Sequence, residues 1–356
     1  MNILILTDGE IFYGGYSTLA YKISNNLNKF KISNKCYSFI FKKKKVDNNE
    51  INLYNKFNDD IKIYSELEKT FSNSTYNKII CTSPWSFYIS SLYFKLQEIL
   101  YIKGGGLANV ENLNGLHILN TNVDDYLDPL TVKLENNAIS NTSNYKILPT
   151  VNIMYQILQK TLKIKFNKKL ILSPLNFAWF ENNKINNIDT KKEYDLVFVV
   201  SNHGRTIKNS HFVYKLFDKL KHLNKIVIGK NCEHYKKILN TTVINKCIPN
   251  SEIEDLFKKS KISLTSSYFD TGPSTLIESI MNGCVSLCYY NCGFSQLNID
   301  GCYTMNNLNI DLWTLKINNI LNNYSNIDIL KNSNKICEKI DKCQKSFIDR
   351  ILFPNF

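Results

Sequence analysis

Two carboxylates, Asp270 and Glu278, lie eight residues apart on either side of a predicted helix start. Gly272 is followed by Pro273, and proline is favoured at the first position of a helix because its missing N–H would have no partner there. Gly283 can end the helix in the left-handed conformation. We therefore expect a short helix with Gly272 as its N-cap, Asp270 just ahead of it and Glu278 more than one turn inside it.

The N-terminus of this predicted helix is suited to bind an anion. Its first N–H groups have no partner within the helix, and they lie at the positive end of the helix dipole. Gly272, Ser274 and Thr275 would present these groups to a phosphate. Asp270 and Glu278 would lie beside the phosphate and could accept hydrogen bonds from hydroxyl groups. This arrangement predicts a nucleotide-sugar site, whereas the alternative is an ordinary capped surface helix.

The spacing of these residues resembles the signature of retaining glycosyltransferases of GT-B fold, in particular glycosyltransferase family 4. Pro273, Leu276, Glu278 and Gly283 are in register with that signature, and Asp270 stands where the family usually has its first Glu. The resemblance implies transfer of a sugar from a nucleotide-diphosphate sugar with retention of anomeric configuration. It also implies that Glu278 binds the ribose hydroxyls, that Asp270 binds the sugar hydroxyls, and that neither a metal nor another cofactor is needed.

A pair of cations follows the apolar run 194–200. Lys208 precedes Asn209, and Arg205 lies three residues before Lys208. The family has an Arg and a Lys at this place that neutralise the leaving diphosphate, although its Arg lies further upstream. Cations fixed beside a phosphate stabilise the charge that develops on a leaving group. We therefore expect Lys208 and Arg205 to be catalytic, and the alternative is a solvated loop.

Two further segments are candidates for donor binding. Gly14 and Gly15 follow the first predicted strand and open a helix, where a backbone can approach an anion closely. They resemble the family's N-terminal glycine loop, although a plain strand–helix turn is the alternative. Ile248 lies in the segment 246–253, ahead of another predicted helix. The matching segment of the family covers the nucleobase, and a plain capping arrangement is the alternative.

The length and the order of elements indicate two domains. The chain has 356 residues, which exceeds the usual size of one core. Short apolar runs alternate with helical patterns, the signal for parallel strands with crossover helices. We expect an α/β chain of two Rossmann-like domains, residues 1–180 and 194–345, joined by a polar linker at 181–193. The GT-B resemblance implies that they face a central cleft and that residues 346–356 cross back to the first domain.

The elements can be assigned from the apolar periodicity. In the first half, strands are expected at residues 2–7, 37–41, 78–82, 99–103, 116–120, 137–140 and 169–173, and helices at 16–27, 85–96 and 149–162. In the second half, strands are expected at 194–200, 225–229, 242–245, 262–265 and 285–289, and helices at 210–220, 233–239, 251–258, 273–282 and 311–347.

The charge of the chain gives a weaker signal about partners. A net charge of +13 suggests an acidic partner, but Lys, Asn, Ile and Tyr are abundant throughout, so a global compositional bias is an alternative. The basic run 42–45 fits a solvated turn better than a lipid-binding surface. Peripheral contact with an acidic membrane surface remains open. We do not expect a nucleic-acid partner, because no interleaved aromatic–basic module occurs.

Cysteine usage and the N-terminus indicate a cytoplasmic protein. The first residues lack the basic region of a signal peptide, and no apolar run approaches the roughly 20 residues that span a bilayer. The ten cysteines are best read as reduced thiols. Cys284, Cys288 and Cys292 recur every fourth residue, but the predicted strand between them would not bring them around an ion. We therefore expect no metal site.

The first domain departs from the family in one respect. Many relatives carry a His-Asp-like pair after the strand that corresponds to residues 99–103, where this chain has the glycines 104–106. His117 is the sole histidine of the first domain and falls in a strand pattern, so we interpret it as structural. The departure keeps open a non-catalytic GT-B scaffold subunit or a GT-B sugar-nucleotide epimerase. The acceptor could be a glycan, a lipid or a protein.

Overall fold

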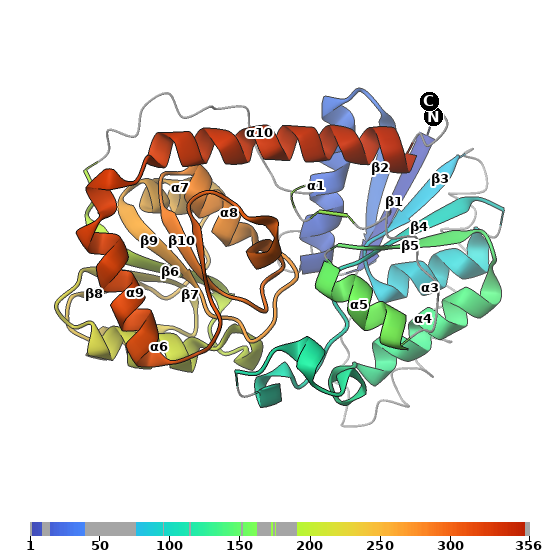
Figure 1. The fold of residues 1–356 in the computed structure, drawn as a ribbon. Coiled ribbons are helices and arrows are strands. Elements are labelled where there is room, and N and C mark those ends of the chain that lie inside the picture. The colour runs from blue at the N-terminus through green and yellow to red at the C-terminus, as the bar shows by residue number, and fades with distance from the viewer. Residues whose placement is uncertain are drawn as a thin grey trace. The chain divides into compact units, whose positions relative to one another are not determined.

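The structure, a computed structural model, groups into two compact units, and Figure 1 shows its ribbon. The first unit comprises residues 1–106 and 128–148, and the second comprises residues 107–127 and 149–356. The residues that the structure describes are 2–8, 15–39, 76–94, 96–113, 115–150, 152–161, 172–173, 175 and 191–352.

The first unit is built on a five-stranded sheet with the order β2-β1-β3-β4-β5. β1 pairs in parallel with β2 and β3, and β3 pairs in parallel with β4. The strands are β1 (Asn2–Asp8), β2 (Ser33–Phe39), β3 (Lys78–Cys81), β4 (Glu98–Lys103) and β5 (Tyr145–Pro149). The helices are α1 (Gly15–Lys29), α3 (Pro84–Tyr93) and α4 (Pro129–Asn141).

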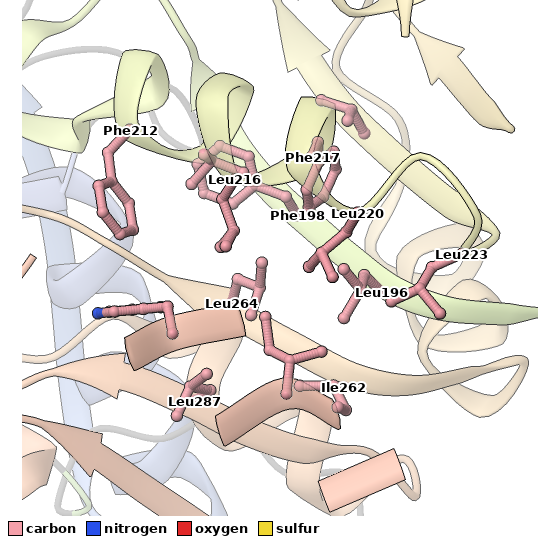
Figure 2. Packing of buried hydrophobic residues seen from close by; sticks show 14 of the residues in the cluster. Leu196, Phe198, Phe212, Leu216, Phe217, Leu220, Leu223, Ile262, Leu264 and Leu287 are labelled. Carbon is pink, nitrogen blue, oxygen red and sulfur yellow. The ribbon is translucent and has the colours of Figure 1, made fainter. Parts of the chain in front are cut away.

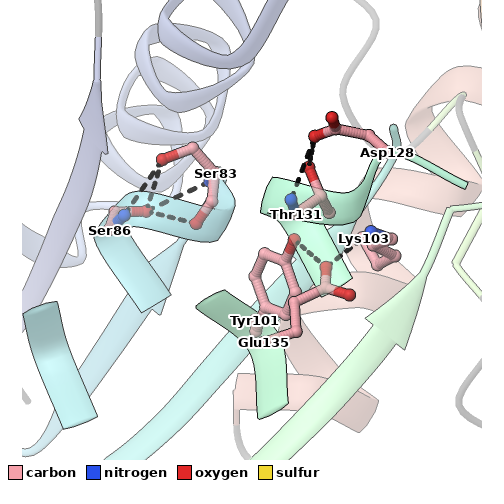
Figure 3. A network of polar contacts seen from close by, with 7 residues as sticks. All are labelled: Ser83, Ser86, Tyr101, Lys103, Asp128, Thr131 and Glu135. Atoms are coloured by element: carbon pink, nitrogen blue, oxygen red, sulfur yellow. Dashed lines mark hydrogen bonds and ion pairs between the residues drawn. The ribbon is translucent and has the colours of Figure 1, made fainter. Parts of the chain in front are cut away.

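Local sequence signals explain where α3 and α4 begin. Ser83 and Ser86 form a reciprocal capping box, in which each hydroxyl accepts the other residue's N–H at 3.1 Å. Asp128 caps α4, since its Oδ2 accepts a hydrogen bond from the N–H of Thr131 at 3.0 Å. Proline occupies the first helical position in both cases. Figure 3 shows both caps.

A buried ion pair joins β4 to α4 (Figure 3). The Nζ of Lys103 lies 2.5 Å from the Oε1 of Glu135, and the hydroxyl of Tyr101 donates to the same oxygen at 2.7 Å. Burial of such charges is tolerated because each has its partner. Gly106 has a φ of +100°, and a Cβ there would lie 2.5 Å from the Lys103 ammonium. The turn at Gly106, next to the ion pair, therefore requires a glycine.

The second unit contains a six-stranded parallel sheet with the order β11-β10-β9-β6-β7-β8. Its strands are β6 (Tyr194–Asn202), β7 (Lys225–Lys230), β8 (Thr241–Ile244), β9 (Ser260–Thr265), β10 (Val285–Tyr289) and β11 (Cys302–Met305). Its α-helices are α5 (Asn152–Thr161), α6 (Ser210–Lys219), α7 (Asn250–Lys258), α8 (Ser274–Met281), α9 (Ile310–Asn322) and α10 (Ile329–Phe347).

Alternate side chains of the central strand β6 serve two separate cores. Leu196 and Phe198 belong to the core that α6 and α9 cover, whereas Val197 and Val199 belong to the core that α7 covers. Figure 2 shows the apolar side chains of α6 packed over the strands, with Leu264 beneath them. A parallel sheet buried on both faces reads as a continuous apolar run, which is why the strands of this half are visible in the sequence.

The expected fold class is confirmed, with two parallel-sheet α/β domains. In the second half, every predicted strand and the helices at 210–220, 251–258 and 273–282 are found within a few residues. The helix predicted at 233–239 is a 3-10 turn over Glu233–Lys237, and β11 was missed. The helix predicted at 311–347 is two helices, since Asp328 caps a new one by accepting the N–H of Lys331.

Two strands predicted in the first half are wrong. Residues 137–140 lie in α4, whose start signal at Asp128 outweighs the short apolar run. Residues 116–120 contain a 3-10 turn, Ile118–Asn120. β5 was missed, and its last residue, Pro149, was assigned to the helix predicted at 149–162. The linker at 181–193 and the strand at 169–173 lie almost wholly outside the described residues, and the crossing of residues 346–356 stays a prediction.

Lys225 gives a test of the second core. Its side chain is fully buried, and its Nζ donates to the carbonyl oxygens of Leu223 at 2.6 Å and Leu220 at 2.9 Å, at the end of α6. Lys225→Met keeps the aliphatic volume but leaves the carbonyl of Leu223 without its donor, while that of Leu220 keeps the N–H of Leu223, so we expect a loss of about 1–3 kcal/mol in the free energy of unfolding. Urea denaturation measures it, with exposed Lys221→Met as the control. Equal stabilities of the two variants would contradict this role.

Candidate functional site

The topology of the second sheet brings two loops together. β6 is the first strand of this sheet along the chain, the next two strands add on one side of it, and β9 adds on the other side. The connections that follow the two strands at such a switch point lead away in opposite directions, which leaves a place for a ligand beside both loops at the carboxyl edge. The loop after β6 carries Arg205 and Lys208, and the loop after β9 carries Asp270.

His203 anchors the loop after β6. Its Nε2 lies 3.0 Å from the carbonyl oxygen of Ile228, and its Nδ1 lies 3.2 Å from the hydroxyl of Ser210. Because a carbonyl only accepts, Nε2 carries the proton and Nδ1 accepts from Ser210. Burial lowers the pKa of His203, which favours this neutral form. The histidine therefore positions the loop rather than taking part in chemistry.

The two loops are also joined by hydrogen bonds to the backbone of the loop after β6. The N–H of Tyr268 donates to the carbonyl oxygen of Ile207 at 2.9 Å. The hydroxyl of Ser266 donates to the carbonyl oxygen of Lys208 at 3.2 Å. Asn209, which ends the 3-10 turn Thr206–Lys208, has a φ of 52° and turns the chain into α6. These bonds fix Lys208 beside the stretch that leads to Asp270.

Lys208 and Asp270, 62 residues apart in sequence, form an ion pair. The Nζ of Lys208 lies 2.6 Å from the Oδ2 of Asp270, and both side chains are mostly buried, with exposed fractions of 22% and 15%. Such a charge-assisted bond is shorter and stronger than one between neutral groups. An ammonium has three donors, so Lys208 can keep this bond and still bind another anion. The structure thus brings two of the three predicted catalytic residues together.

Asp270 also reaches the start of α8. Its Oδ1 accepts a hydrogen bond from the N–H of Gly272 at 3.1 Å. The helix begins at Ser274 with Pro273 as its N-cap, so the expected Gly272 N-cap is wrong by one residue. Its N-cap residue, Pro273, makes no side-chain cap bond. Its first turn, which includes Ser274 and Thr275, therefore has the orphan N–H groups that suit an anion.

Glu278 lies one turn inside α8. Leu276, Ile277 and Ile280 of this helix are buried in the core, whereas Glu278 is half-buried. Gly283 ends the helix with a φ of +85°, as its position predicts. The eight-residue spacing therefore places the two carboxylates along one short helix, Asp270 before its start and Glu278 along its side.

The other predicted site residues lie in three different parts of the chain. Arg205 is exposed at the start of the 3-10 turn that ends at Lys208. Ile248 is half-buried and packs against the core between β6, β7 and α7. Gly15 is the first residue of α1 in the first unit, and Gly14 lies outside the described residues.

Sequence reasoning missed the loop after β10. Asp270 forms a parallel bridge with Cys292, in which its N–H donates to the carbonyl oxygen of Asn291 at 3.1 Å and its own carbonyl accepts from the N–H of Gly293 at 2.8 Å. Gly293, soon after the buried strand β10, was the available sequence signal. It could not show that this loop supports the loop after β9, because that contact depends on the strand order. The loop holds the backbone of Asp270 from the side opposite Lys208.

Metal-ligand clusters and membrane spans are both absent from the described part of the chain. It holds no group of three or more His, Cys, Asp or Glu side chains arranged to bind a metal ion. Cys288 and Cys302 approach to 3.7 Å between sulfur atoms, on neighbouring strands. Among the helices that the structure describes, none has both the length and the apolar character to cross a bilayer.

Comparison with known proteins gives a family match for part of the chain. Residues 181–339 match the family described as glycosyl transferases group 1, a match that includes Lys208, Asp270 and Glu278. No curated protein sequence matches the chain significantly.

Solved structures extend the similarity to the whole chain. Sucrose-phosphate synthase from Thermosynechococcus elongatus has a TM-score of 0.72 at 10% identity, covering 99% of this chain and 100% of that one. HepE from Anabaena, in complex with UDP and glucose, has a TM-score of 0.62 at 9% identity, covering 98% and 99%. The lipopolysaccharide outer core galactosyltransferase WaaB has a TM-score of 0.63 at 14% identity, covering 99% of both. The fold is that of GT-B glycosyltransferases.

Glu278 gives a test of the GT-B site assignment. If its carboxylate accepts hydrogen bonds from donor hydroxyls, Glu278→Ala removes an interaction of about 1.5–3 kcal/mol, which corresponds to roughly a 10- to 150-fold weaker Kd. Calorimetric titration with nucleotide sugars measures the change, and melting temperature verifies that the variant is folded. Glu338→Ala, at an exposed position on α10, is the control. Unchanged donor affinity in folded Glu278→Ala would exclude this role.

Proposed function

We propose that the protein is a retaining glycosyltransferase that transfers a sugar from a nucleotide-diphosphate sugar to an acceptor, without a metal ion. The observation that carries the proposal is the Lys208–Asp270 ion pair beside the start of α8. It lies at the switch point of a sheet whose residues match glycosyl transferases group 1. HepE, whose complex contains UDP and glucose, supports UDP-glucose as the first donor to test.

In this mechanism Lys208 and the first turn of α8 bind the diphosphate. The phosphate oxygens gain negative charge as the glycosidic bond breaks, and a fixed ammonium and a helix N-terminus stabilise that charge. Only the part of this interaction that grows towards the transition state raises kcat. Arg205, exposed on the same loop, would add a second cation.

Asp270 and Glu278 would bind hydroxyl groups on either side of the diphosphate. Asp270 would accept from the transferred sugar and Glu278 from the ribose. The acceptor hydroxyl would approach the sugar from the face that the diphosphate leaves and pass its proton to a leaving phosphate oxygen. Such front-face substitution retains the configuration without an enzymic nucleophile.

The acceptor is proposed only by class, as a glycan, a lipid or a protein. A cytoplasmic location and peripheral contact with an acidic membrane surface stay predictions. A GT-B scaffold without activity is the second candidate, because the ammonium of Lys208 is paired with the carboxylate of Asp270.

A donor-hydrolysis assay distinguishes the two candidates. The protein is incubated with a panel of UDP-, GDP- and ADP-sugars in EDTA, and release of the nucleoside diphosphate is measured. We expect turnover of at least one donor, with UDP-glucose tested first. If no donor turns over or binds, the transferase assignment is wrong. If activity returns only when Mg²⁺ or Mn²⁺ is added, metal independence alone is wrong.

Single substitutions of the two cations separate their roles. Lys208→Ala removes a preorganised cation from the developing charge, so we expect kcat to fall by roughly 10²- to 10³-fold. Arg205→Ala measures whether the exposed arginine shares this role, and a similar loss would show that it replaces the family's upstream arginine. Steady-state kinetics with the best donor provides both values. Near wild-type kcat in both variants would contradict phosphate binding by this loop.

A further inference from the structure

Asn291, in the loop after β10, is fully buried and uses every hydrogen-bonding group of its side chain. Its Nδ2 donates to the carbonyl oxygens of Tyr268 at 3.0 Å and Leu116 at 3.1 Å. Its Oδ1 accepts from the N–H of Ile118 at 3.4 Å. A buried amide with all its groups paired specifies one arrangement of its neighbours, because any other leaves polar groups unpaired.

The same residue holds the stretch 268–270 at two points. Its side chain binds the carbonyl oxygen of Tyr268, and its main-chain carbonyl oxygen accepts from the N–H of Asp270 at 3.1 Å. The two points lie two residues apart, directly before the carboxylate that bonds to Lys208. The backbone that carries Asp270 is thus fixed from the β10 side, whereas Lys208 holds only its side chain.

We propose that Asn291 is a positioning residue of the transferase, which acts through Asp270. The inference rests on the proposed function. One oxygen of Asp270 lies 2.6 Å from Lys208 and the other 3.1 Å from the N–H of Gly272, and both distances depend on where the backbone of Asp270 lies. A displacement of about 1 Å at a reacting centre can cost roughly 10²-fold in rate. Asn291 prevents such a displacement.

Tyr289, the last residue of β10, provides a matched control two residues before Asn291. Its hydroxyl donates to the carbonyl oxygen of Gly115 at 2.5 Å, so it binds the same segment as Asn291 does. No hydrogen bond among the described residues joins its side chain to the stretch 268–270. Tyr289→Phe therefore weakens the docking of residues 115–118 without loosening Asp270.

The first experiment compares kcat and KM of donor turnover. Asn291→Leu, which keeps the branched shape of the side chain, removes all three side-chain bonds, and we expect kcat to fall by about 10- to 100-fold. Tyr289→Phe should keep kcat within about twofold. Asn291→Ser replaces the leucine variant if that protein does not fold, and melting curves decide this. Equal losses in Asn291 and Tyr289 variants would overturn the inference, because the effect would then come from residues 115–118.

The second experiment is a double-mutant cycle with Asp270→Asn. If Asn291 acts through Asp270, adding Asn291→Leu to Asp270→Asn should change kcat by less than about threefold, since coupled residues are not additive. Additive losses would overturn the inference. Its failure is distinguishable from that of the proposed function: an inactive wild type contradicts the function, whereas an active wild type with an equally active Asn291→Leu contradicts only the role of Asn291.

Discussion

The ion pair of Lys208 and Asp270 depends on a constraint of topology rather than on sequence proximity. The chain adds β7 and β8 on one side of β6 and then returns to add β9 on the other side. Parallel strands end at the same edge, so the loops after β6 and β9 meet although 62 residues separate the two charges. The start of α8 lies at this edge for the same reason, because it follows the loop that carries Asp270. A different strand order would separate the cation from both.

The ion pair also explains how a mostly buried cation is held in one position. A buried charge without a partner is costly, and Asp270 supplies the partner for Lys208. The second oxygen of Asp270 accepts the N–H of Gly272, so the carboxylate is satisfied on both sides. A phosphate would accept hydrogen bonds from the remaining N–H donors of the ammonium and from the N–H groups in the first turn of α8. The two bonds of Asp270 hold the ammonium in a fixed position, and a fixed charge needs little reorganisation during the reaction.

The sequence predicted the second unit better than the first, for a physical reason. Strands buried on both faces, such as β6, read as apolar runs, and Pro273 and Gly283 mark the limits of α8 within one residue. In contrast, 137–140 was read as a strand because four residues do not distinguish a helix from a strand. The eight-residue spacing predicted Asp270 and Glu278, but the contact with Lys208 and the role of Asn291 depend on strand order. That order is set by packing over the whole sheet, which no local pattern records.

Residues 107–127 also have contacts that their local sequence pattern does not predict. They follow β4 of the first unit but pack with the second, where Asn291 and Tyr289 bind the segment 115–118. His117 lies in this segment, and its predicted strand is absent. Its Nδ1 instead accepts the N–H of Leu119 at 3.2 Å, and its ring packs on Tyr290 with 4.3 Å between centroids. Burial lowers its pKa and favours the neutral ring, so Nε2 carries the proton. The structural role inferred for His117 is therefore retained through a helix cap and a ring contact, neither of which its strand-like pattern indicates.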